Sequence, residues 1–216
     1  MQAQRNRDLA GFVTAHLPPP SARVLEVGCG SGALARALLE AGYDVTAIDP
    51  DAPDGPPFLR VKLEELESSG PFEAVVAARS LHHLHDLDAA LDKIRGLLVP
   101  GGVLVVDDYA KERVDRPTAD WYYERRQAIA RSGGRAAPGS FAACLREWQE
   151  DEADIHEYAA MRAELDLRFR ERFFAWGPYL FLELGEAAPP DVEQRLIDSG
   201  AIQATGFRYV GETRLR

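Results

Sequence analysis

Short apolar runs separated by helical stretches are the feature that most restricts the fold of this chain. The intervening segments, such as residues 34–41 and 87–99, have the apolar spacing of amphipathic helices and end at glycine or at Pro-Gly-Gly. Continuous apolar strands that alternate with helices are typical of a parallel sheet covered on both faces. We therefore predict an α/β, doubly wound, mostly parallel sheet with strands at 23–27, 45–48, 58–61, 72–77 and 103–107.

A glycine-rich turn, Gly-Cys-Gly-Ser-Gly, follows the first predicted strand. Gly28 and Gly30 lack a Cβ, so the backbone can turn sharply and its amides can approach a ligand closely. Together with Ala33 they also match the dinucleotide fingerprint, so the glycines alone do not separate a nicotinamide cofactor from an adenosyl one. Glu26 favours an adenosyl sulfonium, because a carboxylate at the end of a buried strand needs a cation or hydrogen-bond donors.

Four segments, in order along residues 22–108, carry a resemblance to a known family. After Val-Leu-Glu-Val-Gly-Cys-Gly-Ser-Gly come Tyr-Asp-Val-Thr-Ala-Ile-Asp-Pro-Asp, then Phe-Glu-Ala-Val-Val-Ala-Ala-Arg-Ser-Leu-His-His-Leu-His-Asp, and finally Leu-Leu-Val-Pro-Gly-Gly-Val-Leu-Val-Val. In these segments the chain resembles the class I S-adenosylmethionine-dependent methyltransferases, in their small-molecule branch (methyltransferase type 11/12-like). The resemblance implies a Rossmann-like fold, S-adenosyl-L-methionine as cofactor and S-adenosyl-L-homocysteine as product.

The resemblance also assigns roles to residues. Asp49 is expected to accept hydrogen bonds from the ribose hydroxyls, and Glu26 to lie near the methionine end of the cofactor. The acid that contacts adenine in many members of the family aligns with Lys62, so Glu64 is the candidate, with a solvated surface acid as the alternative. The predicted cofactor-binding residues are Glu26, Gly28, Cys29, Gly30, Asp49, Pro50, Leu63, Glu64, Arg79 and Ser80.

Three histidines and an acid, His82, His83, His85 and Asp86, follow the fourth predicted strand. These are zinc-ligand types, but the adjacent His82 and His83 are expected to point apart, so no metal is predicted. The resemblance places the His-His pair between cofactor and acceptor. Because imidazole titrates near neutral pH, His83 or His82 is a candidate general base, and a structural role is the alternative.

The segment 111–174 interrupts the alternation and is largely helical by pattern. A breaker at 132–139 divides it into two arms, and apolar residues at helical steps extend the second arm to Phe173. A last helix follows at 191–199, and the sixteen residues after Gly200 allow at most a tight hairpin around Thr205-Gly206. The predicted parts are a cofactor-binding core at 1–110, a helical insertion or lid at 111–181, and a last helix with edge strand at 182–216.

Four residues of this second half are candidates for the acceptor site. His156 is expected on the second helical arm, one turn after Glu152, as a further candidate base. Tyr122 and Arg126 of the first arm can form an aromatic and cationic contact, and Tyr179 lies in a segment that resembles acceptor-closing segments of related enzymes. Ordinary amphipathic packing is the alternative interpretation.

Composition limits the partners. The chain has 216 residues, with 25 Lys and Arg against 35 Asp and Glu, so its net charge is −10 and nucleic acid is not expected to bind. No apolar run approaches the length of a membrane span, and the polar start is unlike a secretory signal, so we expect a cytoplasmic protein with no membrane association. Two cysteines are too few for a disulfide framework. A homodimer stays open.

The expected function is methyl transfer from S-adenosylmethionine to a small organic acceptor, with oxygen, nitrogen or carbon as nucleophile, by in-line displacement at the sulfonium methyl. Two alternatives stay open. One is a protein that binds this cofactor without transferring the methyl group, and the less favoured one is an NAD(P)-dependent oxidoreductase with the same glycine pattern.

Overall fold

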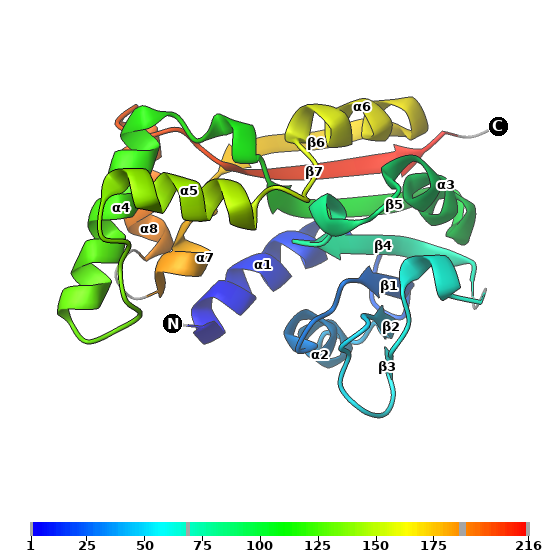
Figure 1. The fold of residues 1–216 in the computed structure, drawn as a ribbon. Coiled ribbons are helices and arrows are strands. Elements are labelled where there is room, and N and C mark those ends of the chain that lie inside the picture. The colour runs from blue at the N-terminus through cyan, green and yellow to red at the C-terminus, as the bar shows by residue number, and fades with distance from the viewer. Residues whose placement is uncertain (1, 68–69, 186–188, 215–216) are drawn as a thin grey trace. The chain divides into compact units, whose positions relative to one another are not determined.

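A seven-stranded sheet in the order β3-β2-β1-β4-β5-β7-β6 is the centre of the fold (Figure 1). The computed structural model describes residues 2–67, 70–185 and 189–214. The strands are β1 (Arg23–Val27), β2 (Asp44–Ile48), β3 (Phe58–Leu59), β4 (Phe72–Ala78), β5 (Leu98–Tyr109), β6 (Phe169–Gly177) and β7 (Gly206–Thr213). The α-helices are α1 (Gln2–His16), α2 (Ala33–Glu40), α3 (Leu87–Leu97), α4 (Arg116–Arg131), α5 (Phe141–Asp151), α6 (Tyr158–Arg168), α7 (Phe181–Leu184) and α8 (Pro190–Asp198). Single 3₁₀ turns are η1 (Leu63–Glu65), η2 (Leu81–His83) and η3 (Lys111–Arg113).

The strand order reverses at β1, which lies between β2 and β4 and is parallel to both. At its carboxyl end Val27 is level with Ile48 of β2 and Ala77 of β4. In open α/β sheets, ligands bind outside the carboxyl ends of the strands at such a switch point. The predicted α/β, doubly wound sheet is confirmed, and its topology places the candidate cofactor site at the ends of β1, β2 and β4.

The chain divides into two compact units. Unit 1 consists of the chain up to Asp108, Ala159–Phe174 and the chain from Arg208 onward; unit 2 consists of Tyr109–Tyr158 and Ala175–Phe207. In unit 1, α1 and α2 cover one face of the sheet, while α3 and α6 lie on the other (Figure 1). Side chains of α1 and α2 form one apolar core with alternate residues of the strands, such as Ala74 and Val76 of β4.

Unit 2 has an apolar core of its own. Tyr109, Trp121, Tyr122 and Leu180 are all buried in it, and they come from the end of β5, from α4 and from the turn before α7. α5 contributes Cys144 to the same cluster. The helices of unit 2 therefore pack on one another through a shared aromatic core rather than standing as separate arms.

The second helical arm is shorter than predicted, because Phe169–Gly177 form the strand β6. Phe173 contacts Phe12 of α1, with ring centroids 5.7 Å apart, whereas its neighbour Phe174 lies against the guanidinium of Arg162 in α6. Successive side chains on opposite faces are the signature of a strand. The prediction of helix as far as Phe173 was therefore wrong; aromatic residues pack well in sheets, and the sheet supplied the partners.

The last residues form one strand, β7, within the predicted limit of at most a tight hairpin around Thr205-Gly206. β7 lies between β5 and β6, and its arrow points opposite to that of β6 in Figure 1. The prediction of an edge strand here was wrong, because β6, which comes from the segment that was expected to be helical, takes the edge position. None of the helices in the described part of the chain is both long and apolar enough to cross a bilayer.

Candidate functional site

The glycine turn after β1 is closed by hydrogen bonds to the end of β2. The amides of Gly28 and Cys29 both donate to the carbonyl of Ile48, at 2.9 and 3.1 Å. Gly28 has φ +78°, and a Cβ there would lie 2.3 Å from the Cβ of Ser80. Gly30 has φ +48° and would meet nothing within 4 Å. The positive φ angle favours glycine at both positions. Close packing is a second reason at Gly28 alone, because a Cβ there would collide with Ser80.

Asp49, one residue beyond β2, holds this turn. The amide of Gly30 donates to its Oδ2 at 2.9 Å, and the amide of Asp51 donates to its Oδ1 at 2.8 Å. The carboxylate is half-buried, beside the exposed Pro50. Since each carboxylate oxygen has two lone pairs, Asp49 can accept further hydrogen bonds from a ligand that reaches the turn.

Glu26 lies inside the sheet, level with Ala47 of β2 and Val76 of β4. Its side chain is 3% exposed, and its Oε2 has no hydrogen-bond partner among the described residues. Burial raises the pKa of Glu26 to about 8, against the lowering effects of a backbone hydrogen bond at Ala35 and of the Arg79 charge. A buried acceptor of this kind fits a ligand that brings positive charge or hydrogen-bond donors.

Arg79 and Ser80 follow β4 and support the glycine turn from the next strand. Arg79 has φ +58°, unusual for a residue with a side chain, and its amide donates to the carbonyl of Asp107 at 2.7 Å. The Ser80 hydroxyl is buried and donates to the carbonyl of Val27 at 2.6 Å. Ser80 therefore packs beneath the turn.

The predicted adenine-side residues lie in η1. Leu63 is buried, and Glu64 is exposed with its backbone carbonyl accepting a hydrogen bond from Lys93 at 2.9 Å. Glu65 caps the turn through the amide of Lys62. Both interpretations of the Glu64 carboxylate fit this position, and its contact with a cofactor stays a prediction.

His82 is buried and its Nδ1 pairs with Asp108, whose other oxygen accepts the amide of Leu81 at 2.9 Å. The rings of His82 and His83 touch, with centroids 4.0 Å apart, so the expectation that they point apart was wrong; the tight η2 turn brings them together. Desolvation and the charge of His82 lower the pKa of His83, which favours the neutral form of its ring. The sequence analysis did not name Asp108 as a partner of His82. The signal was the pair of acids, Asp107 and Asp108, at the end of a predicted strand.

Asp86 accepts the amide of Ala89 and caps α3, which gives the acid beside the histidines a structural role. Across residues 2–67, 70–185 and 189–214, no three His, Cys, Asp or Glu side chains are grouped as metal ligands.

The predicted acceptor residues lie in unit 2. Tyr122 and Arg126 are together: the Arg126 guanidinium donates to the Tyr122 hydroxyl at 3.2 Å, and that hydroxyl donates to Glu183 at 2.6 Å. Tyr179 stacks on Tyr109, with centroids 4.5 Å apart. His156 lies in the connection between α5 and α6, so its predicted helical position after Glu152 was wrong; α5 ends one residue before Glu152.

Comparison with known proteins gives relatives of one kind. A family model described as a methyltransferase domain matches residues 1–133. An uncharacterized methyltransferase of Mycobacterium bovis is 38% identical over 112 residues, covering 44% of this chain and 54% of that protein. A ubiquinone biosynthesis O-methyltransferase of Xanthomonas axonopodis pv. citri is 37% identical over 112 residues, covering 43% and 45%. The chain thus spans about half the length of the curated relatives it matches.

A solved structure extends the likeness to almost the whole fold. The 1,6-didemethyltoxoflavin-N1-methyltransferase of Burkholderia thailandensis, with bound 1,6-didemethyltoxoflavin and S-adenosylhomocysteine, has a TM-score of 0.59 and 18% identity. The match covers 97% of this chain and 78% of that one. At this identity the likeness is one of fold.

The doubly wound sheet and the glycine turn with its two acids define a class I S-adenosylmethionine-dependent methyltransferase, with S-adenosyl-L-methionine as the cofactor of the class. The chain belongs to the methyltransferase-domain family, whose model covers more than half of its residues. The predicted family, fold class and cofactor are confirmed, and the oxidoreductase alternative is not favoured.

Proposed function

We propose that this chain transfers the methyl group of S-adenosylmethionine to a small organic acceptor. The observation that carries the proposal is the pair of acids at the glycine turn: Asp49 beside the turn, and Glu26 buried behind it with an unpartnered oxygen. The cofactor supplies a methyl group on a positively charged sulfur that is already a good leaving group. The protein has to bind, align and exclude water.

Each acid has a distinct part in this proposal. Asp49, already fixed by the amides of Gly30 and Asp51, accepts the two ribose hydroxyls with its remaining lone pairs. Glu26 becomes ionised near the methionine end, where the ammonium and sulfonium charges offset the cost of its burial. Glu64 and Leu63 stay further candidate contacts of the adenosyl group.

His83 is the proposed proton acceptor where the acceptor atom carries a proton at neutral pH. Its neutral ring is exposed, and it contacts His82, which Asp108 holds in one orientation. The acceptor atom is left open. The relatives include an O-methyltransferase and an N1-methyltransferase, so the family supports either oxygen or nitrogen.

Calorimetric titration with S-adenosylhomocysteine, with NAD as the comparison ligand, tests the cofactor assignment. We expect S-adenosylhomocysteine to bind and NAD not to bind. Asp49→Ala should weaken binding about ten- to a hundredfold, because hydrogen bonds to a charged acceptor are each worth about 1.5 to 3 kcal/mol. Asp44→Ala, an exposed acid at the opposite end of the same strand, is the control and should leave the affinity unchanged. Equal affinity of the Asp49 variant and the parent would move the ribose contact elsewhere.

A further inference from the structure

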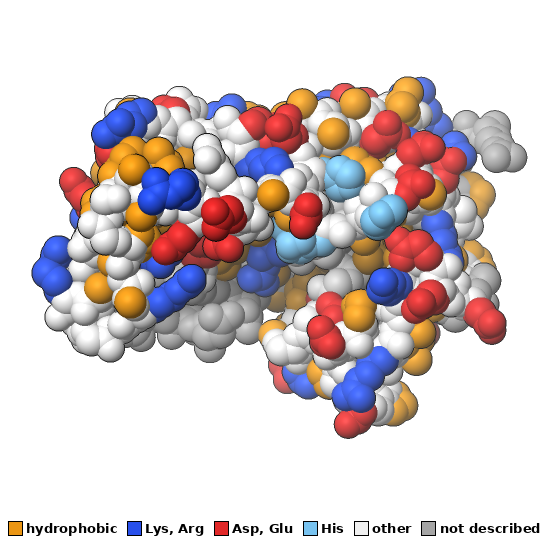
Figure 2. Space-filling view, viewed as in Figure 1, with side chains coloured by type: hydrophobic (Ala, Val, Ile, Leu, Met, Phe, Trp, Pro, Cys, Tyr) orange, Lys and Arg blue, Asp and Glu red, His pale blue; other side chains and the backbone are white. Residues whose placement is uncertain are grey.

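A cavity of about 310 Å³ lies within unit 2, bounded by α4, α5 and α7. Its volume falls at the lower end of the range of roughly 300 to 1,000 Å³ that is typical of small-molecule pockets. Acidic side chains gather over the carboxyl-terminal end of α5, which forms one wall (Figure 2). The cavity therefore has the size for a small ligand and a wall rich in negative charge.

Two aromatic rings line the cavity. The rings of Tyr122 and Trp148 meet edge to face, with centroids 4.6 Å apart, and Tyr122 is buried. Aromatic walls give an apolar surface for the carbon skeleton of a ligand, and their faces attract organic cations.

Carboxylates outnumber guanidiniums in the lining. Glu147, Asp151, Glu152 and Glu183 face two arginines, of which Arg126 lies 3.7 Å from Glu147. Glu183 accepts a hydrogen bond from the neutral Tyr122 hydroxyl, and within the described ranges neither it nor Asp151 forms an ion pair. The negative charges of Glu152 and Glu183 both contribute to raising the pKa of the buried Tyr109. The two carboxylates are therefore close enough to influence the same group. The excess of carboxylates over guanidiniums in the lining favours a ligand with a cationic nitrogen.

The buried guanidinium of Arg126 adds a second requirement. Its side chain is 8% exposed, and its terminal nitrogens make long hydrogen bonds, 3.2 Å to the Tyr122 hydroxyl and 3.4 Å to the carbonyl of Ala136. Its Nε is buried and has no hydrogen-bond partner in the part of the chain that the structure describes. A buried donor without an acceptor is costly, so a ligand that brings an oxygen acceptor to this wall is favoured.

We propose that this cavity binds a small organic ammonium ion that also carries an oxygen acceptor. The ammonium group lies among the carboxylates of α5 and α7, the carbon skeleton against Tyr122 and Trp148, and the oxygen near Arg126. This site belongs to unit 2 alone and does not rest on the cofactor assignment or on the identity of the methyl acceptor.

Calorimetry on the full chain with tyramine as the probe tests the site, because tyramine combines an ammonium group, an aromatic ring and a hydroxyl. We expect saturable one-to-one binding. 2-Phenylethylamine, which lacks the oxygen, should bind several-fold more weakly. 3-(4-Hydroxyphenyl)propionate has the same ring and hydroxyl but a carboxylate in place of the ammonium, and it should not bind.

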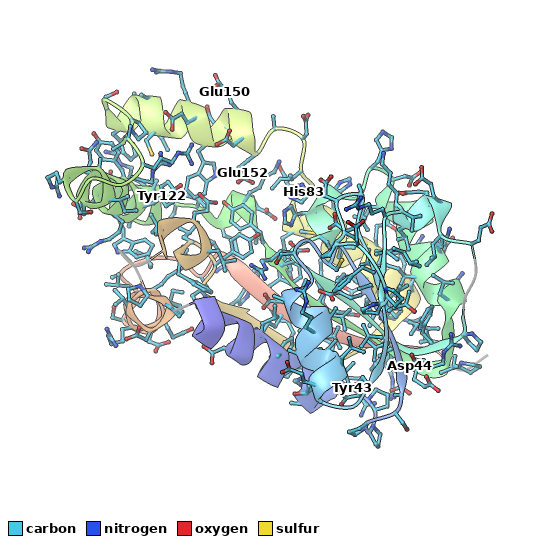
Figure 3. All side chains as sticks on the ribbon, turned by 90° about the horizontal axis from the view of Figure 1, so that it is seen from below. Tyr43, Asp44, His83, Tyr122, Glu150 and Glu152 are labelled. Carbon is cyan, nitrogen blue, oxygen red and sulfur yellow. The ribbon has the colours of Figure 1, made fainter. Side chains whose placement is uncertain are left out.

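Variants of two glutamates provide a matched comparison. Glu183→Gln keeps an oxygen for the Tyr122 hydroxyl but removes the charge, and should weaken tyramine binding roughly tenfold or more. Glu150→Gln removes a charge from the same acidic region, but Glu150 is exposed and points away from Tyr122, unlike Glu152 (Figure 3). It should leave the affinity within about twofold of the parent. Asp151→Asn, at an exposed position, supplies a second test if Glu183→Gln fails to fold.

The proposal is overturned if tyramine does not bind, if the propionate binds as well as tyramine, or if Glu150→Gln weakens binding as much as the cavity variants do. S-adenosylhomocysteine is titrated in parallel. Its binding depends on Glu26 and Asp49 in unit 1, so failure of the cavity proposal and failure of the cofactor assignment give different results.

Discussion

At the level of single residues, the two carboxylates at the glycine turn, Glu26 and Asp49, differ in burial and in hydrogen bonding. Asp49 accepts two backbone amides and stays at the surface end of β2, whereas Glu26 is buried with one oxygen unpartnered. Burial raises the pKa of Glu26 to about 8, so the free protein holds it protonated at pH 7. Cofactor binding should change that state.

We expect the affinity for S-adenosylmethionine to rise with pH up to about 8. Cationic groups near Glu26 favour its ionised form, so below its pKa binding must release a proton, and the affinity gains up to about tenfold per pH unit. Calorimetry in buffers of different ionisation enthalpy measures that proton release. Glu26→Gln should abolish it. A pH-independent affinity of the parent protein would mean that Glu26 stays protonated in the complex.

At the level of elements, the pairing of α6 with α3 in unit 1 depends on one arginine. Arg168, 7% exposed, contacts Asp88, Asp92 and Glu164. The carboxylates are more exposed than the guanidinium, so they keep their hydration when it is removed. The Arg168 guanidinium connects the carboxyl-terminal end of α6 to α3 through Asp88 and Asp92.

Arg168→Met should lower the free energy of unfolding by about 1 to 3 kcal/mol, measured by urea denaturation. The control is Arg170→Met, where the side chain is 70% exposed and pairs with Glu212. That change should stay within about 0.5 kcal/mol. Equal effects of both substitutions would show that the ion pairs of Arg168 add nothing to stability.

In unit 2, the buried Glu193 of α8 holds the turn before α7. Its Oε1 accepts the amides of Tyr179 and Leu180 at 2.9 and 3.1 Å, and its Oε2 accepts that of Phe181 at 2.7 Å. These bonds offset a desolvation cost that nevertheless leaves the pKa of Glu193 raised.

Glu193→Gln should destabilise the protein by about 2 kcal/mol or more, because the amide nitrogen then faces a backbone donor. Thermal unfolding followed by circular dichroism measures the change. Asp191→Asn, on the same helix and exposed, is the control and should leave the unfolding temperature almost unchanged. A small effect of Glu193→Gln would mean that water replaces the lost partner.

The first five strands and the glycine turn could be predicted because local pattern determines them: apolar runs at β1 and β4, and Gly28 directly after a strand. Glu26 and Asp49 could be named as candidate cofactor contacts for the same reason, since each lies at or next to the end of its strand, and that role stays a prediction. β6 could not be predicted, because Phe169 and Phe173 suit a helical spacing as well as a strand, and no glycine or proline marks the end of α6. The pairing of His82 with Asp108 joins residues 26 apart and required the fold.

At the level of the whole molecule, two units with separate cores share three strands. β5, β6 and β7 each begin in one unit and end in the other. Each of these strands is expected to unfold as one piece. Unfolding of one unit would therefore disrupt strands that also belong to the other unit.

We expect the two units to unfold in one transition. All three tryptophans, Trp121, Trp148 and Trp176, belong to unit 2, so their fluorescence reports on that unit alone, whereas far-ultraviolet circular dichroism reports on both. The two signals should give the same denaturant midpoint. A fluorescence midpoint well below that of circular dichroism would show that unit 2 unfolds by itself.

β6 also ends the sheet, and an edge strand exposes backbone groups to which another chain can add a strand. Its sequence begins Phe-Arg-Glu-Arg, and the side chains of Arg170 and Arg172 are 70% and 57% exposed, both pairing with Glu212. If a second copy of this chain added its own β6 at this edge, the arginines of the two strands would repel each other. The charged start of β6 thus protects an otherwise aromatic strand from aggregation during folding and at high protein concentration.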